Sequence, residues 1–415
     1  MAQMSSVFVC LLFFFFTVSA QRMTPPLDPA DFIALLRIRN SLRDLHGSEF
    51  LSTWNLSSPD PCSSFSGVIC AVDANNIVRV SSLTLGTGLT DSWGLTGTIS
   101  PALCELTALV QLVVYPGKII GSIPDCIGGL SRLRFISLTN NLFSGTIPTS
   151  LAYLSMLHTL DLGYNLLEGR VPPDLTKLGD LKVLILADNR LSGEVPPIES
   201  ELLHLDLRSN SFSGQLPQLP STLRYLCASR NGLVGPLTNL PELPDLEFVD
   251  LSMNEFNGPI PETLFTGSPQ LSTVMLQRNN LSGEIQSVYN PGLLSTVDLS
   301  HNFLSGEVPR GLAGAESVYL NNNRLTGVVP WDYVRSLYDG GLKTLYLQHN
   351  YLSGFPLPTG TPPPPQTAAL CLSYNCMEPP VGPAGCPSSM GGQRSRPGYQ
   401  CSSSSSAFNT TTTKV

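Results

Sequence analysis

The residue types that carry out most enzymatic chemistry are present in this chain, but they do not fall into a catalytic pattern. There is neither a Gly-x-Ser-x-Gly nucleophile motif nor a His-Glu-x-x-His metal motif. Gly86-Thr87-Gly88 begins like a dinucleotide-binding loop, but Asp91 stands where the third glycine would be. We therefore expect a protein that is not an enzyme, with no catalytic residues, no metal site and no cofactor. The five histidines lack the spacing of metal ligands; they are His46, His158, His204, His301 and His349.

The ten cysteines are concentrated toward the two ends of the chain. In an exported protein, such clusters are disulfides far more often than zinc sites. We expect Cys62 to pair with Cys70, and the four C-terminal cysteines to adopt one of three pairings. Cys227 stands alone, and we expect a quiet, partly shielded thiol. The cysteines expected in disulfides are Cys62, Cys70, Cys104, Cys126, Cys371, Cys376, Cys386 and Cys401.

Residues 1–20 have the features of a secretory leader. An apolar run from Val7 to Phe16 precedes the small residues Val18-Ser19-Ala20. This run is shorter than the roughly 20 apolar residues that span a bilayer, and the chain ends in Ser and Thr without a hydrophobic tail. We expect a secreted, extracellular protein with no transmembrane segment. Candidate N-glycosylation sites are Asn55, Asn280 and Asn409.

The net negative charge of the chain argues against partners that are themselves polyanions. The net charge is −8 and the pI is about 5.1. Binding to nucleic acid or to an anionic membrane needs clustered Lys and Arg, so neither is expected as a partner.

One pattern fills the middle of the chain, namely L-x-x-L-x-L-x-x-N-x-L-x-G-x-I/V-P. Clear copies begin at Leu133, Leu157 and Leu181. The repeat length averages about 23 residues over roughly twelve copies, which is typical of a solenoid. The asparagines of the pattern are Asn141, Asn165, Asn189, Asn210, Asn231, Asn254, Asn279, Asn302, Asn323 and Asn350.

Each position of the repeat has a physical role. In Leu160-Asp161-Leu162, period-2 alternation predicts a short strand with the leucines inward and Asp161 outward. Asn165 follows at a corner, where a buried amide can satisfy backbone groups of its own coil and of the next. Gly169 permits a tight backbone path, and Pro172 ends the segment. Stacked coils then share one continuous apolar core.

The ends of such a stack need caps. Asp28-Pro29 predicts a helix with Asp as its N-cap. Cys104 and Cys126 would lie on adjacent coils, where a bridge is sterically allowed. We expect a leader at 1–20, an N-terminal cap of a helix and a Cys pair at 21–76, repeats at 77–356, a Pro- and Cys-containing C-terminal cap at 357–386, and a disordered Ser/Thr-rich tail at 387–415.

The outward positions of the predicted inner sheet are the candidate binding surface. Exposed aromatic side chains on a rigid sheet are typical of interfaces, although they also stabilise neighbouring strands. Asp161, Asp206, Asp250 and Asp298 all occupy one slot of the repeat, so the consensus explains them better than binding does. The candidate partner-binding residues are Phe135, His204, Arg208, Tyr225, Phe248, Met275, Gln277, Tyr319, Tyr346 and Gln348.

These motifs resemble those of the plant extracellular leucine-rich-repeat family, which includes polygalacturonase-inhibiting proteins and the ectodomains of receptor-like proteins and receptor kinases. The resemblance covers about residues 27–386 and is most specific in Leu191-Ser192-Gly193-Glu194-Val195-Pro196 and in Cys62 to Cys70, which ends Gly-Val-Ile-Cys. It implies an α/β fold, a right-handed leucine-rich-repeat solenoid with a parallel concave β-sheet and short 3-10 turns on the convex side.

The resemblance further implies recognition of proteins or peptides. We expect a monomer that binds a protein or peptide ligand, a receptor ectodomain or a wall-associated enzyme, in signalling or defence at the plant cell wall. Two alternatives stay open. One is an enzyme inhibitor of the polygalacturonase-inhibiting kind, and the other is a wall-structural protein tethered through its Pro/Ser/Thr-rich C-terminal part.

Overall fold

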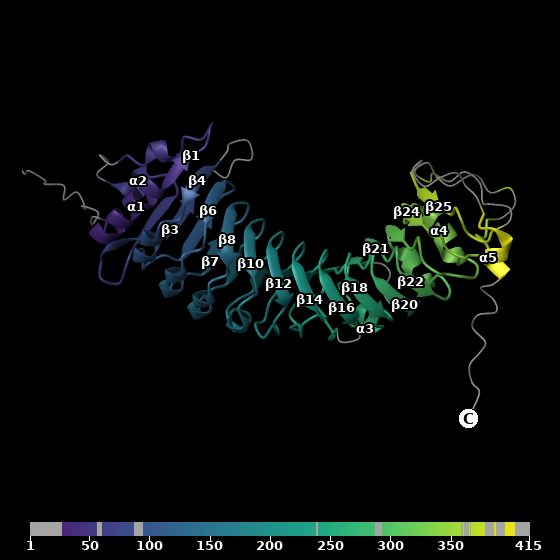
Figure 1. The fold of residues 1–415 in the computed structure, drawn as a ribbon. Coiled ribbons are helices and arrows are strands. Elements are labelled where there is room, and N and C mark those ends of the chain that lie inside the picture. The colour runs from purple at the N-terminus through teal and green to yellow at the C-terminus, as the bar shows by residue number, and fades with distance from the viewer. Residues whose placement is uncertain are drawn as a thin grey trace, which may run out of the picture.

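The computed structural model is a curved solenoid in which each repeat forms one coil (Figure 1). It describes residues 27–55, 60–86, 94–237, 240–286, 293–357, 360, 365, 367–377, 386 and 395–402. The expected leader at 1–20, the sequon at Asn409 and most of the expected tail from 387 lie outside these ranges. Within the ranges, the longest helix has 13 residues, and none combines the length and apolar composition needed to cross a membrane.

A 14-stranded sheet lines the inner side of the curve, as predicted. Its first two strands pair antiparallel, and the later neighbours pair in parallel. In spatial order its strands are β2 (Val68–Val72), β3 (Val78–Leu85), β5 (Gln111–Val114), β7 (Phe135–Ser137), β9 (Thr159–Asp161), β11 (Val183–Ile185), β13 (His204–Asp206), β15 (Tyr225–Cys227), β17 (Phe248–Asp250), β19 (Thr273–Met275), β21 (Thr296–Asp298), β23 (Ser317–Tyr319), β24 (Thr344–Tyr346) and β25 (Ala369–Cys371).

Alternation along each short strand explains how the sheet covers the core. Leu160, Leu184 and Leu205 are the middle residues of three neighbouring strands, and they pair in register. All three are completely or almost completely buried. Because the period of a strand is two, the residues on either side of each leucine face the concave surface.

The asparagines of the repeat stack in one line along the solenoid, and we call this line the asparagine ladder. It joins successive coils as the repeat predicts. The Asn165 Oδ1 accepts a hydrogen bond from the Phe143 amide at 3.1 Å. Its Nδ2 donates to the Leu138 carbonyl of the preceding coil at 3.0 Å and to the Leu162 carbonyl at 3.1 Å. The residue before it, Tyr164, has φ of +56°, which lets the chain turn the corner.

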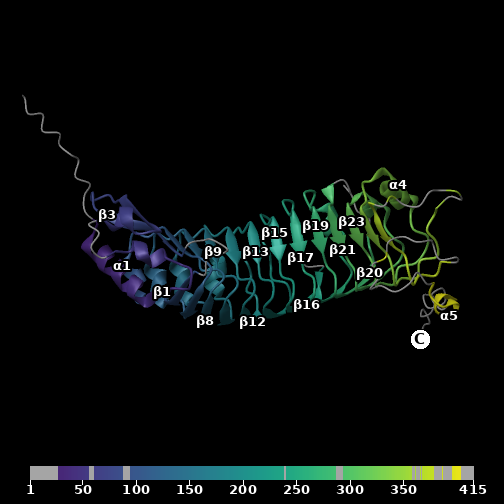
Figure 2. The same cartoon turned by 90° about the horizontal axis from the view of Figure 1, so that it is seen from above.

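A second sheet, of 11 strands, runs beside the first along most of the array and ends at β22 (Figure 2). The repeat pattern predicts only turns after the asparagine, so this sheet is a difference from expectation. Each strand has a single deeply buried side chain, such as Leu167, so a period-2 pattern is too short to show in the sequence. Its strands are β1 (Leu42–Asp44), β4 (Leu95–Thr98), β6 (Lys118–Gly121), β8 (Leu142–Thr146), β10 (Leu166–Gly169), β12 (Arg190–Glu194), β14 (Ser211–Gly214), β16 (Gly232–Pro236), β18 (Glu255–Gly258), β20 (Asn280–Glu284) and β22 (Phe303–Ser305).

Short helical turns close the convex side, as the resemblance implied. The 3-10 turns are η2 (Pro101–Glu105), η3 (Asp125–Gly129), η4 (Thr149–Tyr153), η5 (Pro173–Lys177) and η8 (Arg310–Gly314), while η1 (Phe50–Thr53) lies in the N-terminal cap. Two coils carry α-helical turns instead, α3 (Thr263–Thr266) and α4 (Trp331–Asp339). Tyr333 of α4 is completely buried, and its hydroxyl donates to the Pro309 carbonyl at 2.8 Å.

The N-terminal cap begins with the predicted helix α1 (Pro29–Ser41), in which Asp28 accepts from the Ala30 amide. Inside it, Asp31 is fully buried and binds the Arg79 guanidinium through two oxygens, at 2.8 and 3.0 Å. Trp54 stacks on Phe65 with ring centroids 5.0 Å apart. The short helix α2 (Pro61–Ser64) completes the cap. The open end of the apolar core is therefore covered by a helix, a bidentate ion pair and two rings.

The cysteines that we expected to pair do so, and the structure selects one C-terminal pairing. The disulfides are Cys62–Cys70, Cys104–Cys126, Cys371–Cys386 and Cys376–Cys401, the last of these reaching helix α5 (Gly398–Ser402).

The repeats continue into the segment expected to be the C-terminal cap. Asn375 extends the ladder, accepting from the Leu352 amide at 3.0 Å. Beyond it, the Arg396 guanidinium lies 4.0 Å from the Tyr351 ring centroid and 4.7 Å from that of Tyr374. Asn375 follows Asn350 at an ordinary repeat spacing, but no Leu-x-Gly-x-Ile/Val-Pro follows it, and this absence hides the last repeat in the sequence. The distal end is thus closed by a cation over two rings.

Candidate partner-binding surface

The side chains that face the inside of the curve form two straight rows, because neighbouring strands pair in register. The first row runs along Phe135, Thr159, Val183, His204, Tyr225, Phe248, Thr273, Thr296, Ser317 and Thr344. The second row runs along Ser137, Asp161, Ile185, Asp206, Cys227, Asp250, Met275, Asp298, Tyr319 and Tyr346.

Three rings of the first row form a continuous stack at the centre of the sheet. The centroids of His204 and Tyr225 lie 4.1 Å apart at 8°, and those of Tyr225 and Phe248 lie 4.4 Å apart at 4°. The strand spacing of about 4.8 Å imposes this face-to-face geometry. The rings stack along the sheet, so they present their edges to the concave space. Each of the three is half-buried.

The ring stack is uncharged at neutral pH. Burial lowers the pKa of His204, and the nearby positive charge of Arg208 lowers it further. Burial raises the pKa of Tyr225 to about 12, and the neighbouring groups Cys227 and Asp206 add to this. A neutral, half-buried aromatic ridge suits contact with an apolar or polar peptide surface better than contact with an ion.

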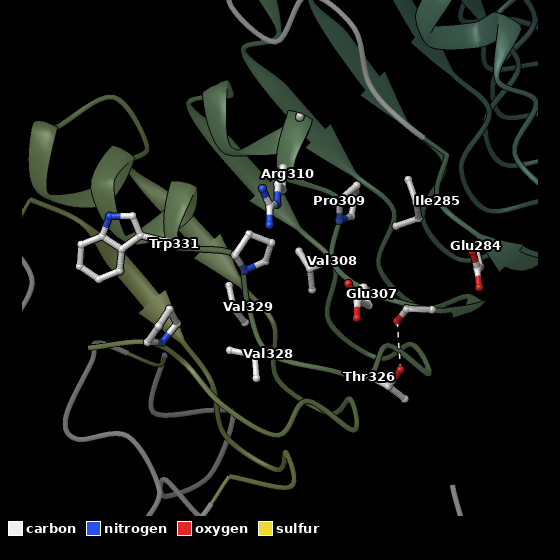
Figure 3. Close-up of a pocket in the computed structure, with 14 residues that line it drawn as sticks. Glu284, Ile285, Glu307, Val308, Pro309, Arg310, Thr326, Val328, Val329 and Trp331 are labelled. Carbon is white, nitrogen blue, oxygen red and sulfur yellow. Dashed lines mark hydrogen bonds between the residues drawn. The ribbon is translucent and has the colours of Figure 1, made fainter. Parts of the chain in front are cut away.

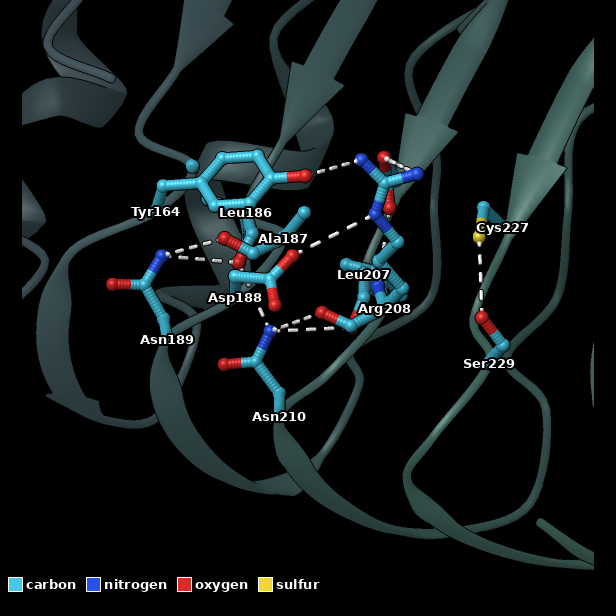
Figure 4. Close-up of polar contacts among 12 residues, drawn as sticks. Tyr164, Leu186, Ala187, Asp188, Asn189, Leu207, Arg208, Asn210, Cys227 and Ser229 are labelled. Atoms are coloured by element: carbon cyan, nitrogen blue, oxygen red, sulfur yellow. Dashed lines mark hydrogen bonds and ion pairs between the residues drawn. The ribbon is translucent and has the colours of Figure 1, made fainter. Parts of the chain in front are cut away.

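Arg208 lies near enough to His204 to affect its pKa, and it is held in one orientation by side chains of its own and preceding coils. Figure 4 shows the contacts of Arg208 with Tyr164 and Asp188. Its Nη2 donates to the hydroxyl of Tyr164, two coils away, at 2.9 Å. Its guanidinium nitrogens lie 3.6 Å from the Asp206 carboxylate and 3.7 Å from that of Asp188. The Arg208 side chain remains 35% exposed, so it combines fixed geometry with access to a partner. We call the ring stack together with Arg208 the central patch.

The repeated aspartates are explained by the backbone, as expected from the consensus. In Asp161, Asp206 and Asp298, an Oδ1 accepts from the amide two residues later at 3.0 to 3.1 Å. Burial raises the pKa of all three carboxyl groups. Asp250 makes the same bond to the Ser252 amide. These side chains hold the corner of each coil and are only secondarily available to a ligand.

Cys227 occupies the second row but is almost completely buried, and it forms no disulfide. Its Sγ lies 3.5 Å from the Ser229 hydroxyl and 3.8 Å from an oxygen of Asp250. Burial and the nearby Asp206 carboxylate raise the pKa of the thiol to about 12. The group is therefore a protonated, shielded thiol, in line with the expectation.

A smaller aromatic pair lies toward the C-terminal end of the second row. Tyr319 and Tyr346 meet edge to face with centroids 5.3 Å apart. Both are partly exposed, and so are Met275 and Gln277, whose coil lies two strands before that of Tyr319. Phe135, 36% exposed, lies three strands before the ring stack and does not join it.

Our placement of Gln348 on the exposed surface is wrong. Its side chain is completely buried, and neither amide atom has a hydrogen-bond partner. Gln348 lies two residues before the ladder asparagine, where the chain already turns into the corner of the coil. Ser300 and Asn321 lie at the same position of their coils and are buried as well. Arg208 and Gln277 occupy this position on their coils and are partly exposed, so the position by itself does not decide whether the side chain is accessible.

Sequence reasoning missed the residues immediately before the ladder asparagines. Tyr164 and Met253 are each 42% exposed, and both have positive φ. Arg230, Arg278 and His301 occupy the same exposed position on other coils. The sequence could have identified them, because each directly precedes an asparagine of the ladder. The sequons Asn55 and Asn280 are both exposed.

The described side chains include no group of three or more His, Cys, Asp or Glu arranged to hold a metal ion. The Arg208 guanidinium of the central patch instead contacts Tyr164, Asp188 and Asp206, which lie beside the patch. The arrangement offers rings, one oriented guanidinium and backbone-anchored carboxylates, which are the groups of a recognition surface.

Family models agree with the repeats and with the N-terminal cap. Residues 28–71 match the leucine rich repeat N-terminal domain, and four stretches, at 132–154, 156–178, 201–223 and 293–315, match the leucine rich repeat.

Two curated relatives are plant proteins. The DNA damage-repair/toleration protein DRT100 of Arabidopsis thaliana is 34% identical over 123 residues, which cover 28% of this chain and 32% of that protein. Polygalacturonase inhibitor 1 of Oryza sativa subsp. japonica is 32% identical over 142 residues, or 34% of this chain and 39% of the inhibitor. The chain thus spans well under half the length of these relatives.

Solved structures match a larger share of this chain than the curated relatives do. The PEPR1-AtPEP1 structure matches 84% of this chain and 52% of its own, with a TM-score of 0.64 and 26% identity. The plant peptide hormone receptor RGFR1 in complex with RGF2 matches 68% of this chain and 54% of its own, with a TM-score of 0.52 and 28% identity. By its repeats, its N-terminal domain and its architecture, the chain is a leucine-rich-repeat solenoid that is similar to plant receptor ectodomains and, in sequence, to plant receptor-like proteins and a polygalacturonase inhibitor.

Proposed function

We propose that this chain binds a protein or peptide partner on its concave face, with the central patch as the main contact. The observation that carries the proposal is the stack of His204, Tyr225 and Phe248 beside the oriented Arg208. Aromatic and arginine side chains held rigidly on a sheet are the residues that supply most of the affinity at protein interfaces. A plant peptide hormone receptor with the same architecture supports a peptide or protein as the class of ligand.

The proposed place of action is the plant cell wall space, in signalling or defence. Four disulfides favour an oxidising compartment outside the cell. The apolar leader at residues 1–20 and the exposed sequons Asn55 and Asn280 support export. The role is binding rather than catalysis, in line with the inhibitor among the relatives.

Affinity capture from wall fluid tests the proposal when it is run with matched variants. The wild-type chain and a Tyr225→Ala/Phe248→Ala variant serve as baits. Tyr153→Ala is the control, because Tyr153 is 77% exposed on the convex turn η4. We expect a partner that the wild type and Tyr153→Ala recover equally and that the double variant loses at least tenfold. Equal recovery by all three baits contradicts a concave site at the central patch.

A second candidate is inhibition of a polygalacturonase. The observation that favours it is the 32% identity to Polygalacturonase inhibitor 1 over 142 residues. Plant and fungal polygalacturonases are assayed with an excess of the purified chain. If the wild-type chain lowers the activity of a polygalacturonase and the Tyr225→Ala/Phe248→Ala variant does not, that enzyme is the partner. If no polygalacturonase of the panel loses activity, this candidate is removed.

A further inference from the structure

A second surface lies away from the concave face, in an open groove of about 980 Å³ near the C-terminal end of the array (Figure 3). The groove is lined by residues that follow the strands of the second sheet. Glu284 and Glu307 lie toward one end, and Val328 and Trp331 lie toward the other. A cavity of this size takes a short segment of a chain rather than a whole domain.

The acidic end consists of two exposed carboxylates on adjacent coils. Each side chain packs over the glycine of the following coil: a Cβ added to Gly306 would meet the Glu284 Cγ at 2.7 Å, and one added to Gly327 would meet the Glu307 Cγ at 3.2 Å. No ion pair of the described chain involves either carboxylate. Two neighbouring like charges that make no ion pair attract a cationic group.

The other end of the groove exposes large apolar side chains. Val328 is 55% exposed and Trp331 is 46% exposed. Three prolines, Pro309, Pro330 and Pro356, also line the groove. A tryptophan among aliphatic and proline side chains is the kind of surface on which a proline-rich peptide docks.

The backbone beneath the groove is already hydrogen-bonded between coils. The Thr326 amide donates to the Gly306 carbonyl, and the Ser353 amide donates to the Gly327 carbonyl, both at 2.8 Å. The groove therefore offers no free strand edge to which a β-strand could be added. An occupant must make its contacts through side chains, which suits polyproline II structure because its backbone needs no hydrogen-bonded partner strand.

We propose that this groove binds an extended, proline-rich segment of a partner protein that carries a basic residue at one end. Its lysine or arginine lies against Glu284 and Glu307, and its prolines lie on Val328 and Trp331. Arg310 also lines the groove and repels additional positive charge, so one basic residue fits better than a run of them. This surface is separate from the central patch, and the inference does not depend on the function proposed for that patch.

Binding of synthetic peptides to the purified full chain tests the inference. The probe has one lysine followed by a run of prolines, and fluorescence anisotropy or calorimetry gives its affinity. We expect Trp331→Ala and the double variant Glu284→Gln/Glu307→Gln each to weaken binding at least tenfold. Only the double variant should also reduce the dependence of binding on salt, because it alone removes the charge contact.

Two controls separate a built groove from general charge attraction. Glu194→Gln removes an exposed carboxylate that packs over Gly214 in the same way on a distant coil, and it should leave the affinity unchanged. A peptide with glutamate in place of lysine, and one with lysine before a Gly/Ser run, should each bind at least tenfold more weakly. No binding of the lysine–proline probe, equal binding of the Gly/Ser peptide, or an equal loss in Glu194→Gln overturns the proposal.

Discussion

The two sheets of this solenoid are built by the same coils but use their residues differently. Outward positions of the concave sheet carry rings, carboxylates, a thiol and small side chains. Each complete coil of the second sheet instead places a glycine at positive φ, such as Gly169 at +82° and Gly306 at +79°. Because glycine alone adopts that conformation readily, the backbone restricts the second sheet far more than the concave one. Variation that serves recognition is therefore easiest to accommodate on the concave rows.

The ladder asparagine lies where the two sheets of a coil meet. The Asn254 Oδ1 accepts from the Leu233 amide in the second sheet at 3.1 Å. Its Nδ2 donates to the Ala228 carbonyl beside the concave strand β15 at 2.9 Å and to the Leu251 carbonyl at 3.1 Å. One side chain thus satisfies buried backbone groups of both sheets, and its loss should affect both.

Asn254→Ala should have the largest effect on stability. It leaves the buried Leu233 amide without its side-chain acceptor, and an unsatisfied buried group costs about 1–3 kcal/mol. The Ala228 and Leu251 carbonyls each lose one of two amide donors and keep those of Asn231 and Asn279. We expect the free energy of unfolding to fall by roughly 2–3 kcal/mol, measured by urea denaturation. Asn257→Ala, at an exposed asparagine of the same coil, should change it by less than about 0.5 kcal/mol. Equal effects of the two variants would show that the ladder does not join the sheets in the way proposed.

Gly169→Ala tests the backbone restriction on the second sheet. The new Cβ would meet the Thr146 Cγ2 at 3.0 Å, and alanine at φ of +82° is strained. We expect a loss of about 1–2 kcal/mol in the free energy of unfolding. Gly179→Ala is the matched control, since that glycine has nothing within 4 Å of the added Cβ and should respond by less than about 0.5 kcal/mol. If Gly169→Ala leaves the free energy of unfolding unchanged, the proposal that the backbone restricts the second sheet more than the concave sheet is contradicted.

Phe248→Ala should separate binding from stability on the concave sheet. The ring is half-buried and stacks on one face only, against Tyr225, so we expect a loss of about 1 kcal/mol in stability. Recovery of the concave partner should fall at least tenfold, because a central aromatic contact is removed. A large loss of stability with unchanged binding would assign the ring stack to folding alone.

The pH dependence of His204 should give the smallest effect. Burial, and then Arg208, lower its pKa in the folded chain, so the fold disfavours the protonated ring. The contribution to stability is therefore complete above the unfolded pKa of about 6.5 and is lost as the pH falls from there through the folded pKa. NMR titration should place the pKa below 6.5, and Arg208→Ala should shift it upward. A pKa at or above the unfolded value would contradict the buried, neutral ring.

Much of this architecture was predictable from residue spacing. The recurring Leu-x-Leu-x-x-Asn pattern predicted the concave sheet, the ladder and the shared core, because each role repeats in every coil. The second sheet escaped prediction since its strands bury one side chain each, as at Leu167. The last coil, which contains Asn375, escaped prediction because no Leu-x-Gly-x-Ile/Val-Pro follows that asparagine.

The candidate site was only partly predictable. Spacing placed His204, Tyr225 and Phe248 in one row, and strand register then turned that row into a stack. Spacing alone did not show that Tyr164 reaches Arg208 across two coils, or that Gln348 is buried. These contacts depend on the length of the side chains and on the path of the backbone at the corner of the coil. The alternation of inward and outward residues along a strand determines neither of them.

By itself, the sequence determined that the chain winds into stacked coils, where the capping helix begins and which residues of each concave strand point into the core, because these features follow from local periodicity and from the chemistry of single residues. Only the tertiary structure decided how the four C-terminal cysteines pair, how Arg208 is oriented and where the groove at Trp331 opens. Those features require residues from different coils to meet, and the distance between coils is fixed by packing of the whole array.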